Sequence, residues 1–148
     1  MKFVEEFIFS AKVEDPIEVG KGPYGTRTIF GIESGQVKGK RINGKILGGA
    51  DWSLIGEDGF LKIDVRTQIE TDDGALLYLQ YQGLLGINEL LLEALDKSQQ
   101  TNFGDQYCYT SIRMETGDER YSWVNTTFFI GEGRNIPGGV EYRVWTPE

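Results

Sequence analysis

Apolar and polar residues alternate along most of the chain, which is the pattern of β-strands that bury one face. The clearest strand is predicted over residues 60–70, where apolar positions such as Ile63 alternate with polar ones such as Asp64. Its antiparallel partner is predicted over residues 75–82, across the Asp72-Asp73-Gly74 turn. Further strands are predicted over residues 3–13, 26–32, 36–37, 42–47, 53–55, 107–115, 121–131 and 140–145.

Helical spacing of apolar residues occurs once, over Asn88–Lys97. Asn88 can cap the start of this helix, and Glu89 suits its positive end. Leu91 and Leu95 belong to an apolar stripe that predicts packing against the rest of the protein. A parallel α/β fold would need a helix after nearly every strand, so the pattern predicts an all-β, mainly antiparallel protein.

Glycines punctuate the predicted strands: the chain has 20 of them and only four prolines. Glycine allows the sharp bends of a curved sheet, and closing the sheet removes edges that would otherwise be exposed. We therefore prefer a small closed or nearly closed β-barrel with one short helix to a β-sandwich. No linker or internal repeat is visible, so residues 1–148 are assigned to a single domain.

The formal net charge is −8. Nucleic acids and anionic membranes both reward clustered Lys and Arg, so neither is expected as a partner. Glu5 and Glu6 interrupt the apolar start of the chain, which argues against a signal peptide, and we expect a cytoplasmic protein. Under those conditions the single cysteine, Cys108, is expected to be a buried and unreactive thiol.

Several chemistries are excluded by the residue types present. The chain has no histidine, which removes Ser-His-Asp and Cys-His catalysis in their usual forms. With one cysteine it also lacks the ligands of a zinc site, and we predict no metal site and no cofactor. Residues 20–25 match the dinucleotide pattern G-x-G-x-x-G, but a strand-like segment follows where that motif needs a helix, so a structural turn is expected.

Polar residues on three predicted strands are the candidates for chemistry. Asp64 and Arg66 share one face of strand 60–70, and Arg113 and Glu115 share one face of strand 107–115. A face of strand 121–131 combines aromatic and polar residues, which is typical of a cavity wall. That face carries Tyr121, Trp123 and Asn125. Each set has a plainer interpretation, with the charged residues solvated and the aromatic strand part of the core.

Six short motifs, in the order in which they occur, resemble those of a known family of bacterial and fungal proteins. This is domain-of-unknown-function family 3237, also called uncharacterised protein family 0311. The resemblance covers nearly the whole chain and implies a β-barrel, with no established activity, cofactor or partner. The motifs are Gly22-Pro23-Tyr24-Gly25-Thr26-Arg27, Gly49-Ala50-Asp51-Trp52, Asp64-Val65-Arg66, Thr71-Asp72-Asp73-Gly74-Ala75, Arg113-Met114-Glu115-Thr116-Gly117-Asp118 and Tyr121-Ser122-Trp123-Val124-Asn125.

The resemblance also implies which polar residues form a site, and it favours the polar face of strand 60–70 as the barrel interior. The polar residues it features are Asp51, Asp64, Arg66, Arg113, Glu115 and Asn125, beside the aromatic Trp52, Tyr121 and Trp123. This chain departs from the family pattern at Met114, where phenylalanine is usual, at Tyr109, where arginine is common, and in the shorter loop before Gly49. Those departures bear on the size and charge of a pocket.

We therefore predict a small-molecule pocket protein, with isomerase, cyclase or lyase chemistry run by carboxylates, Arg and Tyr. Asp64 or Glu115 would act as general acid or base, and Arg66 and Arg113 would hold an anionic oxygen. The ligand would be shaped and oriented by Asp51, Trp52, Tyr121, Trp123 and Asn125.

Two alternatives fit the same residues, a binding barrel without turnover and a structural barrel with an internal salt-bridge network. A polar interior would also leave Leu61, Ile63 and Val65 outside the barrel. These side chains would then need cover from the helix or from a second subunit in a homodimer.

Overall fold

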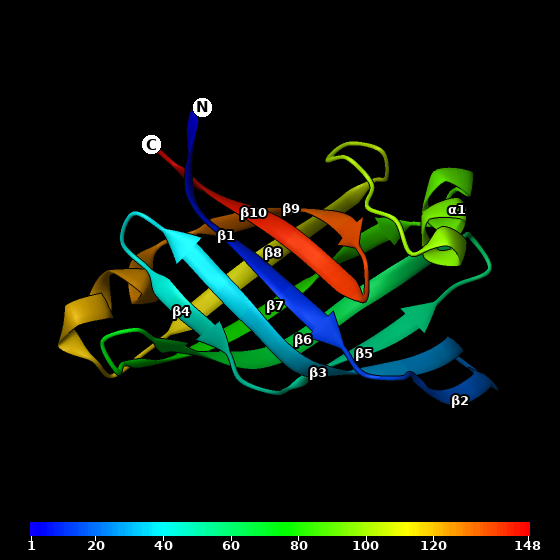
Figure 1. Ribbon diagram of the computed structural model, residues 1–148, viewed down its shortest axis with the longest axis horizontal. Helices are drawn as coiled ribbons and strands as arrows, with labels where there is room; N and C mark the ends of the chain where they lie inside the picture. The colour runs from blue at the N-terminus through cyan, green and yellow to red at the C-terminus, as the bar shows by residue number, and fades with distance from the viewer.

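The computed structural model describes all 148 residues as a β-barrel with two short helices (Figure 1). Every strand pairing is antiparallel, and the pairing of β1 with β3 closes the sheet into a barrel of eight strand positions. The strands are β1 (Phe3–Val13), β2 (Ile17–Gly22), β3 (Gly25–Gly39), β4 (Asn43–Ile46), β5 (Ala50–Ile55), β6 (Phe60–Thr71), β7 (Leu76–Gly86), β8 (Cys108–Glu115), β9 (Phe129–Ile136) and β10 (Gly139–Pro147). The helices are α1 (Glu89–Lys97) and the 3₁₀ helix η1 (Glu119–Thr126). Neither helix is long and apolar enough to cross a membrane.

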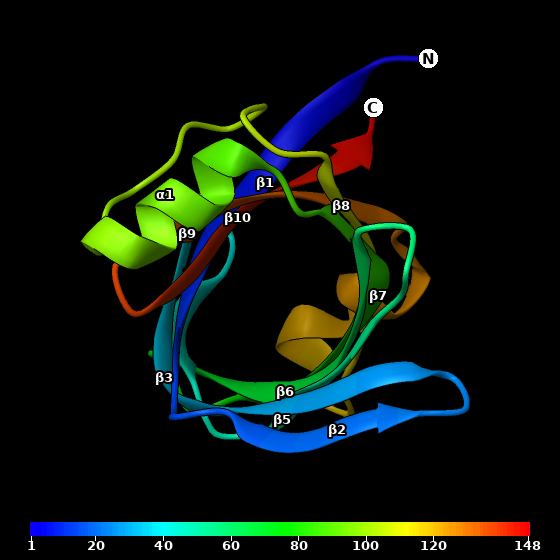
Figure 2. The ribbon, with the colours of Figure 1, turned by 90° about the vertical axis from the view of Figure 1, so that its right-hand side faces the viewer.

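The long strand β3 is shared between two sets of neighbours. Its first half pairs with β5 and β2, and its second half pairs with β4 and β1. β2 has no second partner, so the hydrogen-bonded wall closes between β1 and β3 and stays open beside β2. Figure 2 shows β2 and α1 on opposite sides of this end of the barrel.

The β6–β7 hairpin forms as the sequence predicts, with Asp64 opposite Gln82 in the centre of the ladder. Helix α1 is confirmed too, and the Asn88 side chain accepts a hydrogen bond from the Leu91 amide. The buried face of α1 consists of Leu91 and Ala94, whereas Leu95 is exposed. The glycine-rich segment 20–25 lies at the turn between β2 and β3 and not at a helix start.

Two expectations about sidedness are wrong. Leu61, Ile63 and Val65 lie buried inside the barrel, so they offer no outer surface for a second subunit. Their polar neighbours on β6 therefore face outward, because successive side chains of a strand alternate sides. The apolar set wins the interior because burying unpaired charges there would cost several kcal/mol each, by order of magnitude.

The predicted strand over residues 121–131 is also wrong in its first half. Residues Glu119–Thr126 form η1, and the strand begins only at Phe129. The Asp118 side chain accepts a hydrogen bond from the Arg120 amide and caps η1. The aromatic and polar residues 121, 123 and 125 therefore do not share a sheet face.

Three aromatic rings form a buried cluster in the barrel core. Phe9 stacks on Tyr142 at 5.2 Å between ring centroids, and Tyr81 lies 5.7 Å from Phe9 and 5.4 Å from Tyr142. All three rings are almost fully buried. Because they come from β1, β7 and β10, this cluster holds opposite walls of the barrel together.

Candidate active site

All four residues predicted to be catalytic lie on the outer face of the barrel. Arg66 is exposed and Asp64 is half-buried on β6, and Arg113 and Glu115 are exposed on β8. Their inward neighbours on β8, which include Met114, are buried instead. The prediction that these four side chains point into the barrel is therefore wrong.

The outer residues also fail to converge on one place. Asp64 and Trp52 line a groove of about 470 Å³ together with Arg27, Lys62 and Gln82. A second groove, of about 400 Å³, is lined instead by Arg113, Glu115, Asn125 and Tyr78. Arg66 lines neither groove.

The three predicted ligand residues of η1 hold the helix to the barrel. The Tyr121 hydroxyl donates to the Asp73 carboxylate at 2.8 Å, and Asn125 exchanges two hydrogen bonds with the Thr116 backbone. Trp123 packs on the buried ring of Phe129, and the Arg41 guanidinium lies over the Trp123 ring. These contacts give each side chain a structural role.

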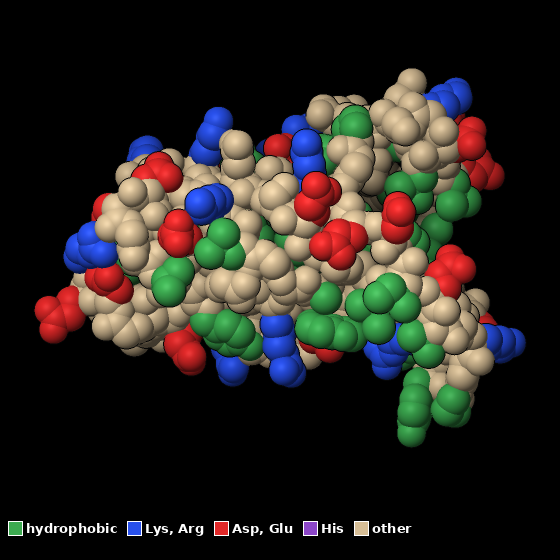
Figure 3. Space-filling model, turned by 60° about the horizontal axis from the view of Figure 1, so that its bottom comes forward, with side chains coloured by type: hydrophobic (Ala, Val, Ile, Leu, Met, Phe, Trp, Pro, Cys, Tyr) green, Lys and Arg blue, Asp and Glu red, His purple; other side chains and the backbone are tan.

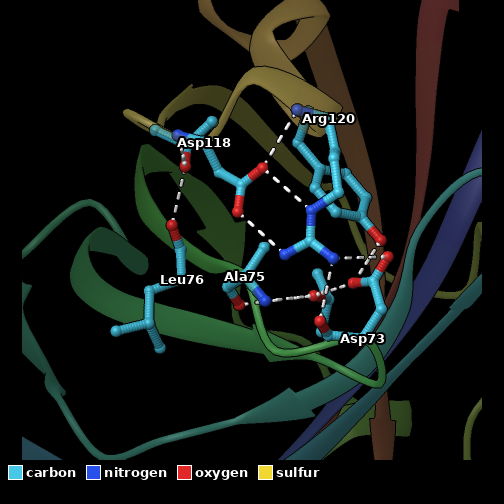
Figure 4. A network of polar contacts seen from close by, with 8 residues as sticks. Asp73, Ala75, Leu76, Asp118 and Arg120 are labelled. Atoms are coloured by element: carbon cyan, nitrogen blue, oxygen red, sulfur yellow. Dashed lines mark hydrogen bonds and ion pairs between the residues drawn. The ribbon is translucent and has the colours of Figure 1, made fainter.

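Arg120 ties η1 to the β6–β7 turn (Figure 4). Its guanidinium binds the Asp118 carboxylate at 2.9 Å, donates to the Asp73 carbonyl, and lies 3.4 Å from the Asp73 carboxylate. Hydrogen bonds from Arg120 lower the pKa of Asp118. The pKa of Asp73 is lowered first by the Thr71 and Tyr121 hydroxyls and only weakly by Arg120.

Arg120→Gln should consequently raise the pKa of Asp118 more than that of Asp73. The reason is that Arg120 is the main cause of the low pKa at Asp118 and a minor one at Asp73. Side-chain carboxyl NMR titration measures both values. Lys97→Gln, which breaks the exposed pair with Glu93, is the control and should move neither. Equal shifts at both aspartates would contradict this arrangement.

Asp51, in contrast, points into the barrel. It lies opposite Val65 of β6 and Phe30 of β3, and cross-strand partners share a face. Val65 is buried in the core, which places all three on the inner side. Asp51 and Phe30 are nevertheless only partly buried, unlike Val65.

The β5–β6 ladder is interrupted beside Asp51. Pairing is regular at Asp51 and again at Leu54, but not at Trp52 and Ser53 between them. Side chains supply the missing partners. The Asp64 amide donates to Asp51 Oδ1 at 3.0 Å, and Arg27 Nη1 donates to the Trp52 carbonyl at 2.8 Å. The Asp51 carboxyl is thereby held at a fixed position in the wall.

Burial raises the pKa of Asp51 above its ordinary value, because a charged carboxylate loses solvation there. The hydrogen bond from the Asp64 amide and the neighbouring Ser53 hydroxyl oppose this rise, and the negative charge of Asp64 adds to it. Asp51 thus combines an inward position, incomplete burial and a raised pKa. These are properties of a general acid.

Sequence reasoning missed the groups that surround Asp51. Burial raises the pKa of Tyr81 and of Tyr142, and the negative charge of Asp51 contributes to both. Cys108 is buried as expected, with Sγ 3.8 Å from the Tyr142 hydroxyl, and burial raises its pKa as well. Four strands therefore bring a carboxyl, two phenols and a thiol into one interior region.

Two buried hydroxyls of the interior have no hydrogen-bond partner, those of Ser53 and Thr110. Ser53 is fully buried beside Asp51. Its hydroxyl is close enough to the carboxyl to lower the pKa of Asp51, but the two groups do not have the geometry of an ordinary hydrogen bond. Such groups are rare in folded proteins, because each unpaired buried hydroxyl costs about 1–3 kcal/mol. Ser53 follows Asp51 by two positions, and that spacing on one strand is the signal that could have identified it.

Inward-facing glycines make room for this cluster. A Cβ atom on Gly133 would lie 2.6 Å from Cys108 Sγ and from the Tyr142 ring, and one on Gly131 would collide with the Thr110 hydroxyl. No three His, Cys, Asp or Glu side chains come together as a candidate metal site. The groups available for chemistry are hydroxyls, a thiol and one carboxyl.

Comparison with known proteins places the chain in a family. The model of a family described as "Protein of unknown function (DUF3237)" matches residues 2–146. This chain belongs to the DUF3237 family. A UPF0311 protein of Clostridium acetobutylicum is 30% identical over 142 residues, covering 95% of this chain and 90% of the relative. A UPF0311 protein of Rhodopseudomonas palustris is 33% identical over 126 residues, covering 84% of this chain and 82% of the relative.

Solved structures of similar proteins have the same fold. A conserved protein of unknown function from Rhodopseudomonas palustris superimposes with a TM-score of 0.87 at 29% identity, covering 98% of this chain and 95% of the other. A β-barrel-like protein from Acinetobacter baumannii gives a TM-score of 0.81 at 31% identity, covering 99% and 96%. The predicted fold is thereby confirmed.

One distant relative of this chain is named as an enzyme. A protein of Penicillium herquei named as a hydroalkoxylation enzyme is 24% identical over 133 residues, covering 88% of this chain and 74% of the relative. An enzyme structure from the same fungus gives a TM-score of 0.74 at 19% identity, covering 99% of this chain and 94% of that one, which shows a shared fold.

Proposed function

We propose that this DUF3237 protein is an acid–base catalyst of the isomerase, cyclase or lyase kind, acting on a small molecule inside the barrel. One observation carries the proposal. The Asp51 carboxyl faces the interior with a raised pKa, next to the buried and unpaired Ser53 hydroxyl. A ligand oxygen placed there would give the Ser53 hydroxyl a partner and lie within reach of the Asp51 carboxyl.

The groups around Asp51 are uncharged hydrogen-bond donors, which suits proton transfer to a neutral ligand. Tyr81 and Tyr142 have raised pKa values, so they stay protonated at neutral pH and can donate hydrogen bonds. Asp51 in its acid form can deliver a proton to a carbon or oxygen of the ligand and recover one from another position. Isomerisation and cyclisation leave the proton count unchanged, so a single carboxyl can serve both steps.

The Penicillium herquei relative supports this reaction class. Hydroalkoxylation adds the O–H bond of an alcohol across a carbon–carbon double bond. Such an addition needs one proton delivered to carbon and one removed from oxygen, with no oxidant or reductant. That requirement matches what Asp51 and its neighbours offer.

A structural salt-bridge network explains Asp51 less well. Asp51 takes part in no ion pair, and all eight ion pairs join other residues. The buried residues include no Asp, Glu, Lys or Arg. A carboxyl that is partly desolvated without an ionic partner destabilises the fold, and a catalytic role accounts for its presence.

The test compares Asp51→Asn with Glu115→Gln, a matched change on the outer face. Compounds that copurify with the whole chain are identified by mass spectrometry, and their conversion is followed by NMR. Asp51→Asn should lower turnover roughly 10²-fold or more, and Glu115→Gln should leave it unchanged. Wild-type turnover in Asp51→Asn would refute the proposal. A compound bound equally by both variants and never converted would favour a binding barrel.

A further inference from the structure

The two sides of the barrel wall differ sharply in charge. Lysines, arginines and nearly all carboxylates lie on the outer surface, where Figure 3 shows both signs spread over the visible face. The four arginines engaged in ion pairs bind carboxylates outside the core: Arg41, Arg120, Arg134 and Arg143. On the inward faces of the strands Asp51 is the one carboxyl, and no cation accompanies it.

This distribution decides which ligands the interior can accept. An anion would lose its hydration there and gain no positive partner, while lying close to the Asp51 carboxyl. A cation would have to hold Asp51 in its ionised form, which burial disfavours. Both kinds of charged ligand therefore pay a desolvation cost that the interior does not offset.

An uncharged ligand meets a complementary surface. The Ser53 and Thr110 hydroxyls are buried without partners and can each donate or accept one hydrogen bond. The inward ring of Phe30 keeps part of its surface exposed beside Asp51 and offers an apolar contact. The adjoining wall is apolar and aromatic.

We propose that the interior around Asp51 and Ser53 takes an uncharged, largely apolar molecule that carries hydroxyl or carbonyl oxygens. This inference rests on the proposed site, and it concerns binding and not turnover. It replaces the expectation from sequence that arginines would hold an anionic oxygen, since Arg66 and Arg113 lie outside.

Three probes of similar size and different charge test the proposal: benzyl alcohol, benzoate and benzylamine. Binding to the whole chain near neutral pH is measured by NMR titration, with amide chemical shifts locating the site. Benzyl alcohol should bind roughly tenfold or more tightly than benzoate and no more weakly than benzylamine. Its shift changes should centre on Asp51 and Ser53 and not on Gln82 of the outer groove.

Variants separate this inference from the catalytic proposal. Asp51→Asn should keep the affinity for benzyl alcohol and the preference for it over benzoate, because an anion loses its hydration in an interior without a cation whichever of the two residues stands at position 51. Tighter binding of benzoate or benzylamine, shift changes on the outer face alone, or no binding of benzyl alcohol at millimolar concentration would each overturn the inference. Loss of turnover in Asp51→Asn with retained alcohol binding would support both proposals, and retained turnover would refute only the catalytic one.

Discussion

Asp51→Asn is expected to stabilise the barrel at neutral pH while it removes the proposed activity. Burial raises the pKa of Asp51 in the folded protein above the value of an exposed carboxyl. Ionisation is therefore harder in the folded state than in the unfolded state. Asparagine keeps the shape and can still accept the hydrogen bond from the Asp64 amide, but it carries no charge to desolvate.

The pH dependence follows from the same difference. Between the ordinary carboxyl pKa and the raised one, the folded protein binds more protons than the unfolded chain, so its stability falls as pH rises through that window. Above the window the loss is complete, at about 1.4 kcal/mol for each unit by which the pKa is raised. Asp51→Asn should remove this decline and should gain little at a pH below the ordinary carboxyl value.

Urea denaturation at acidic and neutral pH measures this effect directly. Glu115→Gln is the control, because its carboxyl is exposed on β8 and surface substitutions usually change stability by less than about 0.5 kcal/mol. Equal stability of wild type and Asp51→Asn at neutral pH would show that Asp51 is not desolvated. The proposed acid would then lose its physical basis.

The strands and the helix could be predicted because their signals are local. Period-two alternation and the Asp72-Asp73-Gly74 turn are enough to place β6 and β7 as a hairpin. Asn88 marks the start of α1 by a cap that uses only neighbouring residues. The strand predicted over residues 121–131 is wrong in its first half, because aromatic residues two positions apart are also typical of a strand. The Asp118 cap favours a 3₁₀ helix there instead.

Which face of β6 lies inside was in principle decidable from the strand itself. Its apolar face holds Leu61, Ile63, Val65 and Ile69, and such a face belongs in the core. The resemblance to the family shifted the weight toward the polar face, because featured polar residues suggest a site. The polar face nevertheless lies outside, because several charges inside a small barrel lack room for partners and water.

The interior cluster could not be assembled from sequence. Asp51, Tyr81, Cys108 and Tyr142 come from β5, β7, β8 and β10, and only the closed register brings them together. Asp51 was identified as a ligand residue, but the interrupted ladder that holds its carboxyl depends on Arg27 and the Asp64 amide. Such long-range geometry leaves no periodic signal in the chain.

Gly49→Ala is expected to destabilise the fold severely, because Gly49 has both a backbone and a steric requirement for glycine. Its φ is +91°, and a Cβ atom would collide with the Arg66 carbonyl and lie 2.9 Å from Thr67 Cα. Gly59 provides a matched comparison, with φ at +82° and open space where its Cβ would be. Gly59→Ala should thus cost only the backbone strain, roughly 1–2 kcal/mol.

The collision at Gly49 adds the cost of displacing β5 from β6. Gly49→Ala should therefore lower the free energy of unfolding by roughly 3–5 kcal/mol, as measured by urea denaturation. The loss should also reach the proposed site. Gly49 lies two residues before Asp51, and its carbonyl accepts the Ile32 amide at 3.0 Å, which anchors the start of β5. The hydrogen bond from the Asp64 amide lowers the pKa of Asp51, and a displaced β5 would weaken that bond.

The pKa of Asp51, followed by carboxyl NMR, should therefore rise in Gly49→Ala and stay unchanged in Gly59→Ala. Equal stability of the two variants would mean that β5 yields without cost, and the fixed position of Asp51 would no longer be supported.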